Sequence, residues 1–302
     1  MHPGPIPAAH AAPAARRVRA SIVRTVRALW GSSHPGPTLV VTALALALGI
    51  ATGLDPWRIA LLTVSVFAGQ LSVGISNDAF DAARDHEVGR TDKPLARGDA
   101  AVGVAWAAAL GLLVLALALS VPLGWRMLAA HALALGSAWA YNAGLKSTPW
   151  SIVPFLVSFG IFPSLATLSA PDPAFAAGWA WIAGAALGAA VHLTNVLPDL
   201  DDDARTGIRG LPHRLGPRAS AVTAALAVVG GAIAVLLGAS GGDLGAVSGV
   251  SWVFFAAVVA VAAITAWRAI ARPPTRALFR LVMLAALLLA TQLVASGSAL
   301  AA

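Results

Sequence analysis

The fold of this chain is indicated by two acidic stretches, NDAFDAARDHEVGRTDKPLARG at 77–98 and NVLPDLDDDARTGIRGLPHRLG at 195–216. Both follow the ungapped pattern N-x3-D-x3-D-x3-G-x4-P-x3-G, and each begins at the end of a long apolar run. An internal repeat of this kind indicates that two parts of the chain share an architecture. The repeat therefore predicts two related helical units, each ending in a cluster of acids.

The composition around these stretches is that of a membrane protein. The chain has 302 residues, of which 58% are hydrophobic and 11% charged, with a mean hydropathy of +0.80. Soluble domains average about 45–50% apolar and about 25% charged residues, so one water-facing globule could not bury this apolar surface. The chain has no cysteine, which excludes disulfides, thiolate metal sites and a cysteine nucleophile.

Apolar runs of the length that crosses a bilayer, about 20 residues, recur along the whole chain. They lie at 38–54, 57–79, 100–119, 124–142, 150–169, 176–198, 217–238, 246–268 and 277–300. Continuous runs without strict alternation favour helices over a barrel. The sequence predicts an all-α integral membrane protein with nine transmembrane helices over 31–302, arranged as two four-helix pseudo-repeats plus one helix.

The segment before the first apolar run has two parts. Residues 1–15 are rich in Pro and Ala and predict a disordered tail. In residues 16–30, apolar side chains such as Ile22 and Val26 fall on one arc of a helical wheel, and arginines such as Arg24 fall opposite. This pattern predicts an amphipathic helix lying on an anionic membrane surface, with a solvated basic tail as the alternative.

Basic residues predict the orientation. Of the 20 Lys and Arg residues, all but Arg58 and Arg126 lie in the N-terminal segment or in every second connection between the apolar runs. Because such residues stay on the cytoplasmic side, we expect a multi-pass protein of the cell membrane with a cytoplasmic N-terminus and an external C-terminus. Four helices separate the two acidic stretches, so both lie on the cytoplasmic side.

The spacing of the acids predicts a metal site. Positions i, i+4 and i+8 share one helical face, so each stretch presents one Asn and two Asp side chains together. Such oxygen donors suit Mg²⁺, and two facing walls of this kind predict a diphosphate held by two or more Mg²⁺ ions. The expected metal ligands are Asn77, Asp81, Asp85, Asn195, Asp199 and Asp203.

Basic residues near these walls would complete a diphosphate site, because Lys and Arg bind phosphate oxygens. The expected substrate-binding cations are Lys93, Arg97, Lys146, Arg209 and Arg214. Three further acids, Asp78, Asp201 and Asp202, lie off the repeated face. Each of these three acids either supports the metal ligands from a neighbouring position or lies in solvent, and both alternatives stay open.

The chain resembles the UbiA superfamily of intramembrane prenyltransferases at these residues. NDAFDAARD at 77–85 is similar to its N-D-x2-D-x3-D signature, and GRTDKPLARG at 89–98 is similar to the basic segment that follows it. NVLPDLDDDARTG at 195–207 is similar to its second D-x3-D motif, and YNAGLK at 141–146 to its Tyr-to-Lys segment. The resemblance covers nearly the whole chain after the tail.

The resemblance implies a helical bundle with a central cavity, a lateral opening to lipid and a Mg²⁺-bound prenyl diphosphate at the cytoplasmic mouth. It implies ionisation to an allylic cation and prenyl transfer to a hydroxybenzoate-, naphthoate- or homogentisate-like ring, as in quinone biosynthesis. The expected catalytic residues are Asp81, Asp199, Lys146 and Tyr141. The expected partners are a prenyl diphosphate, a small aromatic acceptor and the lipid bilayer, without nucleic acid. Asn195 departs from the family, since many relatives have Asp there.

Polar and aromatic residues inside the predicted helices extend the site. Polar side chains in membrane helices usually face the bundle interior, so His192 is expected either to contact the acceptor or to form an interhelical hydrogen bond. A structural hydrogen bond is expected for Gln70, and a structural role for His131. Four aromatic residues would either shield the cation or pack structurally, namely Trp139, Tyr141, Trp150 and Phe155.

Three other functions fit parts of the pattern. A terpene cyclase of the same superfamily shares the ionisation step but uses no acceptor. An ion-coupled transporter is less favoured, because transporter repeats are often inverted and their sites lie near the bilayer midplane. A CDP-alcohol phosphotransferase is disfavoured because the chain lacks a D-G-x2-A-R segment.

Overall fold

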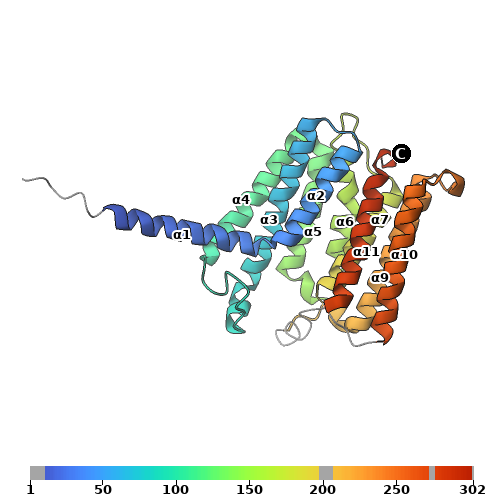
Figure 1. Cartoon of the computed structure of the whole chain (residues 1–302). Helices are drawn as coiled ribbons and strands as arrows, with labels where there is room; N and C mark the ends of the chain where they lie inside the picture. The colour runs from blue at the N-terminus through green and yellow to red at the C-terminus, as the bar shows by residue number, and fades with distance from the viewer. Residues whose placement is uncertain (1–10, 197–206, 272–275, 301–302) are drawn as a thin grey trace, which may run out of the picture.

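The computed structural model describes residues 11–196, 207–271 and 276–300, and Figure 1 shows a bundle of helices from which one helix extends sideways. In these ranges the secondary structure is helical, without a strand, which confirms the all-α prediction. The α-helices are α1 (Ala11–Ser32), α2 (Pro35–Ala51), α3 (Pro56–Glu87), α4 (Val102–Ser120), α5 (Trp125–Ala143), α6 (Val153–Thr167), α7 (Gly178–Asn195), α9 (Leu211–Ala239), α10 (Gly249–Ala271) and α11 (Arg276–Ala295). Short 3-10 turns are η1 (Val121–Leu123), η2 (Leu145–Ser147), η3 (Leu244–Ala246) and η4 (Gly297–Ala299).

Each predicted apolar run coincides with one helix between α2 and α11. Four candidate spans in the described ranges are long and apolar enough to cross a membrane: α3, α4 with η1, α9 and α10. The pair 20–32 and 35–51, bent by 67°, would supply a fifth. These helices indicate a multi-pass membrane protein, while the count of nine spans and the pseudo-repeat stay predictions.

Helices that follow one another in the chain pack side by side. α3 packs against α2 and α4, and α7 packs against α6 and α9. α11 also packs against α2 and α7, which joins the last helix to the first part of the bundle. Buried leucines of α2, α6, α7 and α11 belong to one apolar core, among them Leu48, Leu165, Leu193 and Leu289.

Two helices begin earlier than predicted. α1 begins at Ala11, whereas the amphipathic helix is predicted over 16–30 after a tail at 1–15, and this division of the chain stays a prediction. The Ala-rich residues there favour helix, and a proline is tolerated in a first turn. α9 begins at Leu211, and Gly216, with a φ of 76°, bends it just before Pro217, whose nitrogen cannot donate a hydrogen bond.

Glycines bring α7 close to α6. A Cβ atom at Gly184 would collide with the Phe159 carbonyl, and one at Gly188 would collide with the Phe155 carbonyl. Small residues four positions apart are typical of membrane helices that pack closely. This approach places His192, one turn beyond Gly188, beside the start of α6.

Candidate active site

The last turns of α3 carry the first acidic wall. Asp81 and Asp85 are buried, with exposed fractions of 8% and 4%. The Lys146 ammonium donates to Asp81 Oδ1 over 2.5 Å and to Asn77 Oδ1 over 3.4 Å. The structure therefore brings Asn77, Asp81 and Lys146 together from two elements far apart in the sequence.

Arg84 is a second cation at this wall, and the sequence analysis missed it. Its Nη2 atom lies 3.1 Å from Asp81 Oδ2 and 3.5 Å from Asp85 Oδ1. Both carboxylate oxygens of Asp81 therefore face a cation, Lys146 on one side and Arg84 on the other. The i, i+3 spacing from Asp81, at which opposite charges meet on a helix, was the available signal.

Lys146 lies in η2, which begins directly after Gly144. The φ of 155° at Gly144 turns the chain between α5 and α6. Burial lowers the pKa of the Lys146 ammonium, and the neighbouring Asp81 carboxylate counteracts this by favouring the charged form. The ion pair therefore supports a charged lysine at a mostly buried position.

Lys93 binds the acid that lies off the repeated face. Its ammonium donates to Asp78 Oδ1 over 2.5 Å, and His34 Nε2 lies 3.2 Å from the same oxygen. Asp78 is 2% exposed, so it is a buried anchor that joins the segment after α3 to the junction of α1 and α2. This contact resolves the open role of Asp78.

Arg97 lies away from Lys146. It donates two hydrogen bonds to Asp99 Oδ2 and one to the Thr91 carbonyl, and it lines a cavity against α1. In the same segment Arg90 donates two hydrogen bonds to Asp92 and lowers the pKa of that carboxyl to about 2. Because Asp99 and the Thr91 carbonyl hold the Arg97 guanidinium, it is not positioned for the contact with a diphosphate that the sequence predicts.

The second stretch differs from the first at its start. α7 ends at Asn195, whereas α3 continues from Asn77 past Asp81 to Glu87. The helical face expected for Asn195, Asp199 and Asp203 stays a prediction. Asp199, Asp203, Asp201 and Asp202 lie outside the described residues. Arg209 and Arg214 are exposed, and Arg214 Nε donates to the Arg209 carbonyl.

Ser151 connects the two sides of the second stretch. Its hydroxyl accepts a hydrogen bond from the Leu211 N–H at the start of α9 over 2.8 Å and lies 3.0 Å from His192 Nε2 on α7. His192 thus has a hydrogen-bond partner in the connection before α6 rather than on another helix, and contact with an acceptor stays a prediction. Ser151 had no signal in the sequence, since its partners lie on other elements.

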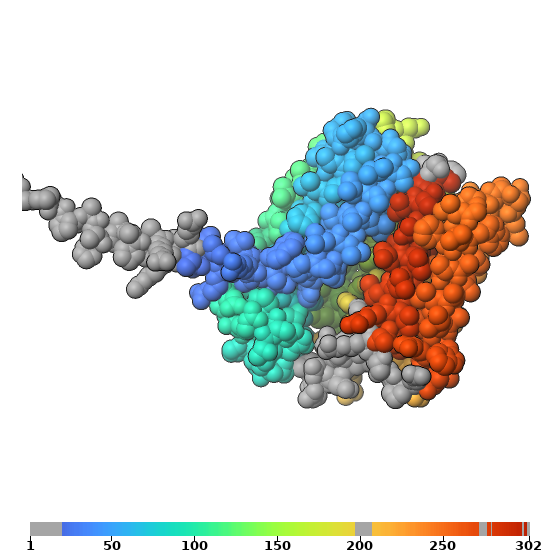
Figure 2. Space-filling view, viewed as in Figure 1, coloured from blue at the N-terminus to red at the C-terminus, as the bar shows by residue number. Residues whose placement is uncertain are grey.

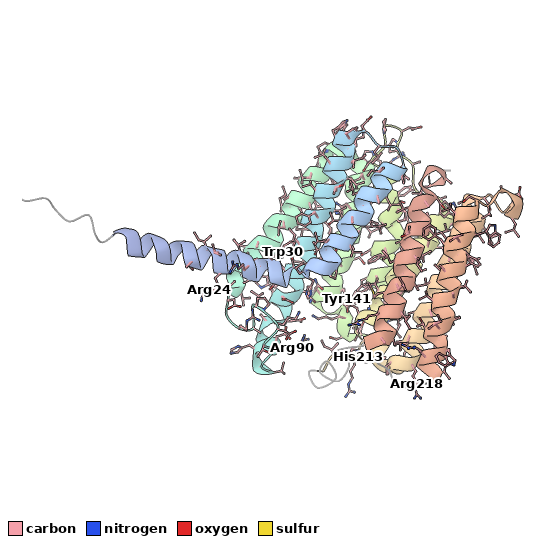
Figure 3. All side chains as sticks on the ribbon, in the orientation of Figure 1. Arg24, Trp30, Arg90, Tyr141, His213 and Arg218 are labelled. Carbon is pink, nitrogen blue, oxygen red and sulfur yellow. The ribbon has the colours of Figure 1, made fainter. Side chains whose placement is uncertain are left out.

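The four candidate aromatic residues fall into two groups. The Tyr141 ring meets the Phe155 ring edge-on at 5.0 Å and the His192 ring at 5.8 Å. Trp139 packs instead against Trp106 and Phe80, and Trp150 is exposed. Figure 3 shows Tyr141 toward the end of the bundle where Arg90, His213 and Arg218 also lie. Only Tyr141 and Phe155 therefore join His192.

The other two polar residues inside the predicted helices, His131 and Gln70, are not part of the group formed by Tyr141, Phe155 and His192. His131 is buried, and its Nδ1 atom lies 2.8 Å from Ser120 Oγ, which confirms a structural role. Gln70 is partly buried on α3.

The donor chemistry of the first wall fits Mg²⁺, because amide and carboxylate oxygens are the donors this ion prefers. In the ranges that the structure describes, no three His, Cys, Asp or Glu side chains converge on one point. The Asp81 carboxylate instead forms ion pairs with Lys146 and Arg84. A metal at this wall would therefore require Asp81 to leave these cations, and further donors from outside α3.

Comparisons with known proteins identify the family and the fold. The sequence profile of the UbiA prenyltransferase family matches residues 38–295. A lycopene elongase/hydratase of Haloferax volcanii is 33% identical over 195 residues, which cover 61% of this chain and 61% of that protein. The chain thus spans less than two thirds of the length of the curated relative that it matches.

Solved structures share the fold. A UbiA homolog from Aeropyrum pernix K1 in its apo form has a TM-score of 0.68 at 16% identity, over 85% of this chain and 96% of that one. A UbiA homolog from Archaeoglobus fulgidus bound to GPP and Mg²⁺ has a TM-score of 0.66 at 17% identity, over 90% and 99% of the two chains. With the profile covering most of its length, this chain belongs to the UbiA prenyltransferase family.

Proposed function

We propose that this protein transfers a prenyl group from a prenyl diphosphate to an acceptor with an electron-rich π system, and that the reaction depends on Mg²⁺. The observation that carries the proposal is the convergence of Lys146 with Asn77 and Asp81 at the end of α3. Family membership supports prenyl transfer over the ion-coupled transport considered from the sequence.

Mg²⁺, when bound, would withdraw charge from the diphosphate leaving group and so favour cleavage of the allylic C–O bond. Asp81 and Asp85 supply oxygens for the ion, with Asn77, Asn195, Asp199 and Asp203 as the other expected donors. Lys146 and Arg84 neutralise Asp81 in the substrate-free protein and turn to phosphate oxygens when substrate binds. Lys93, Arg209 and Arg214 are further candidate phosphate contacts.

His192 is proposed to position the acceptor. Ser151 Oγ accepts the Leu211 N–H and can donate its own proton to His192 Nε2; in that tautomer the ring proton of His192 lies on Nδ1. His192 Nδ1 has no hydrogen-bond partner in the described part of the chain. It would donate to a hydroxyl or carbonyl oxygen of an aromatic acceptor that lies beside Tyr141 and Phe155.

A conjugated polyene is a second candidate acceptor, because the Haloferax volcanii relative bears the name lycopene elongase/hydratase. A polyene offers an electron-rich double bond but no oxygen to His192. His192→Phe therefore separates the two candidates: transfer to an aromatic acceptor should fall, and transfer to a polyene should persist.

The test uses the full chain in lipid nanodiscs with Mg²⁺, several prenyl diphosphates and one acceptor at a time. Acceptors are a hydroxybenzoate, a naphthoate, homogentisate and lycopene, and products are identified by mass spectrometry. Prenyl transfer to the ring replaces one acceptor hydrogen, releases a proton and diphosphate, and requires Mg²⁺. Rapid acceptor-independent release with a cyclic hydrocarbon as product would establish the cyclase and overturn transfer.

The orientation is a separate proposal. We infer a cytoplasmic N-terminus, an external C-terminus and an active site on the cytoplasmic side, supported by the placement of the basic residues. Reporter fusions after residue 145 and after residue 296 should report the cytoplasm and the exterior. The same side for both positions would contradict this topology.

A further inference from the structure

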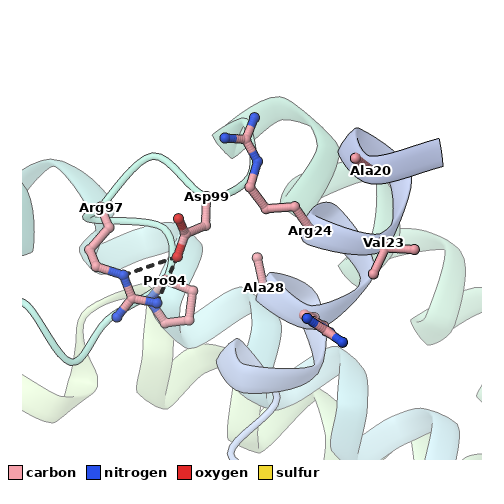
Figure 4. A pocket seen from close by; sticks show the side chains of 8 residues that line it. Ala20, Val23, Arg24, Ala28, Pro94, Arg97 and Asp99 are labelled. Carbon is pink, nitrogen blue, oxygen red and sulfur yellow. Dashed lines mark hydrogen bonds and ion pairs between the residues drawn. The ribbon is translucent and has the colours of Figure 1, made fainter. Parts of the chain in front are cut away.

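A cavity of about 700 Å³ lies between α1 and the segment that follows α3, apart from the acidic wall. Arg24, Arg27 and Ala28 line it from α1, and Pro94, Arg97 and Asp99 line it from the segment (Figure 4). Neither the family fold nor the proposed reaction gives this cavity a role.

The charges around the cavity favour an anion. Its lining has three guanidinium groups and one carboxylate, and Arg97 already occupies that carboxylate through hydrogen bonds of 3.0 and 2.6 Å to Asp99 Oδ2. Arg24 and Arg27 are exposed and form no ion pair with any described residue. Arg24, Arg27 and Arg97 line the same cavity, and planar guanidinium groups match phosphate oxygens.

The surroundings of the cavity favour a lipid as the source of that phosphate. α1 carries large exposed apolar side chains, with exposed fractions of 57% for Ile22, 60% for Val26 and 42% for Trp30. Figure 2 shows α1 extending outward from the bundle, and the labelled Arg24 and Trp30 mark it in Figure 3. A helix with arginines and exposed apolar residues suits the boundary between head groups and acyl chains.

The walls of the cavity belong to a packed unit. Ala28 shares a buried apolar cluster with Leu95 and Ala79, and a Cβ atom at Gly31 would lie 3.0 Å from Pro94. Lys93, directly before Pro94, donates to Asp78 on α3. A ligand between α1 and this segment would therefore bind a preformed site rather than a free tail.

We propose that this cavity binds the head-group phosphate of an anionic phospholipid, whose acyl chains lie along the exposed apolar face of α1. Arg24 and Arg27 bind the phosphate, while Arg97 stays paired with Asp99 on the opposite wall. The bound lipid fixes α1 against the segment that carries Lys93.

The test measures lipid binding to the detergent-solubilised full chain by native mass spectrometry, in EDTA so that the proposed reaction plays no part. The probes are dioleoylphosphatidylglycerol and dioleoylphosphatidylcholine. The variant Arg24→Gln/Arg27→Gln is compared with Arg218→Gln/Arg268→Gln, which removes the same charge from α9 and α10. We expect wild type and control to prefer phosphatidylglycerol, and the α1 variant to bind it about 10- to 30-fold more weakly.

Three results would overturn the proposal. The first is unchanged phosphatidylglycerol binding in the α1 variant. The second is an equal loss of binding in the control variant, which would indicate an effect of general surface charge. The third is full displacement of the lipid by excess inorganic phosphate, which would indicate a site for the free anion. Retained melting temperature of the α1 variant checks that the exposed substitutions leave the bundle folded.

Discussion

The two acidic stretches share their Asn, Asp, Gly and Pro positions, yet the helices that lead into them end differently. α3 continues through Asn77, Asp81 and Asp85 to Glu87, whereas α7 ends at Asn195, the first position of the repeat. Three residues after this Asn, the first copy has Phe80 and the second copy has Pro198. Because proline disfavours helix at and before its position, this difference predicts a weaker helix at the start of the second stretch.

The stretches are also held differently. Ion pairs of Lys146 and Arg84 hold the first wall, and a neutral hydroxyl, Ser151, joins the helices on both sides of the second. Both Lys146 and Ser151 belong to the connection between α5 and α6. This short connection therefore links the two halves of the candidate site.

The largest effect is expected from removing one acid of each wall. Asp81→Ala and Asp199→Ala should each lower prenyl transfer in nanodiscs by at least about 10²–10³-fold, because each removes a carboxylate proposed to bind Mg²⁺. Asp172→Ala, at an exposed acid, is the control and should keep full activity. Full activity in only one of the two variants would show that the two walls are unequal in function.

The next effect tests the residue that distinguishes the stretches. Phe80→Pro should break α3 between Asn77 and Asp81 and lower the free energy of unfolding by about 3 kcal/mol or more. Phe80→Ala is the matched control, because it removes only the ring that packs edge-on against Trp106 at 4.7 Å. Equal melting temperatures for the two variants would contradict the role given to a continuous α3.

A smaller effect is expected at Lys146. Lys146→Met should lower prenyl transfer by about 10- to 100-fold, since a charged hydrogen bond to the diphosphate is lost and Asp81 keeps only Arg84. Lys146→Arg, which retains the charge, should lose less. Initial rates over a range of prenyl diphosphate concentrations check this, and an unchanged kcat/KM in Lys146→Met would exclude Lys146 from the substrate site.

The smallest effect concerns the second stretch. Ser151→Ala should lower stability by about 1–3 kcal/mol, because the Leu211 N–H and His192 Nε2 lose their shared partner. Ser251→Ala, at a serine in an exposed hydrogen bond to Ser248, is the control. Thermal unfolding in detergent measures both, and equal midpoints would mean that Ser151 does not hold the helices around the second stretch.

The sequence predicted those parts of the site that depend on helical spacing. Asn77, Asp81 and Asp85 share a face because α3 is continuous there, and the resemblance brought Lys146 to the same place. For the second stretch the spacing argument stays a prediction, since Asp199 and Asp203 lie outside the described residues. Composition and apolar runs were sufficient for an all-α membrane protein, because hydropathy acts over whole helices.

Contacts set by tertiary packing could not be predicted. Ser151 meets His192 and Leu211 only because glycines draw α7 onto α6 and α9 begins beside them. Arg97 has the same basic character as Lys93, but the turn after α3 directs one toward α1 and the other toward Asp78. No periodicity in the sequence distinguishes these two directions.

The central claim is that the wall on α3 holds a diphosphate through Mg²⁺, and binding of an unreactive prenyl thiodiphosphate tests it most directly. Calorimetry on the full chain in nanodiscs would compare wild type with Asp81→Asn, each in Mg²⁺ and in EDTA. We predict that wild type binds at least about tenfold more tightly in Mg²⁺, since the metal joins two like-charged groups, and that Asp81→Asn loses most of this difference. Equal affinity of wild type with and without Mg²⁺, or an unchanged Mg²⁺ effect in Asp81→Asn, would contradict the account.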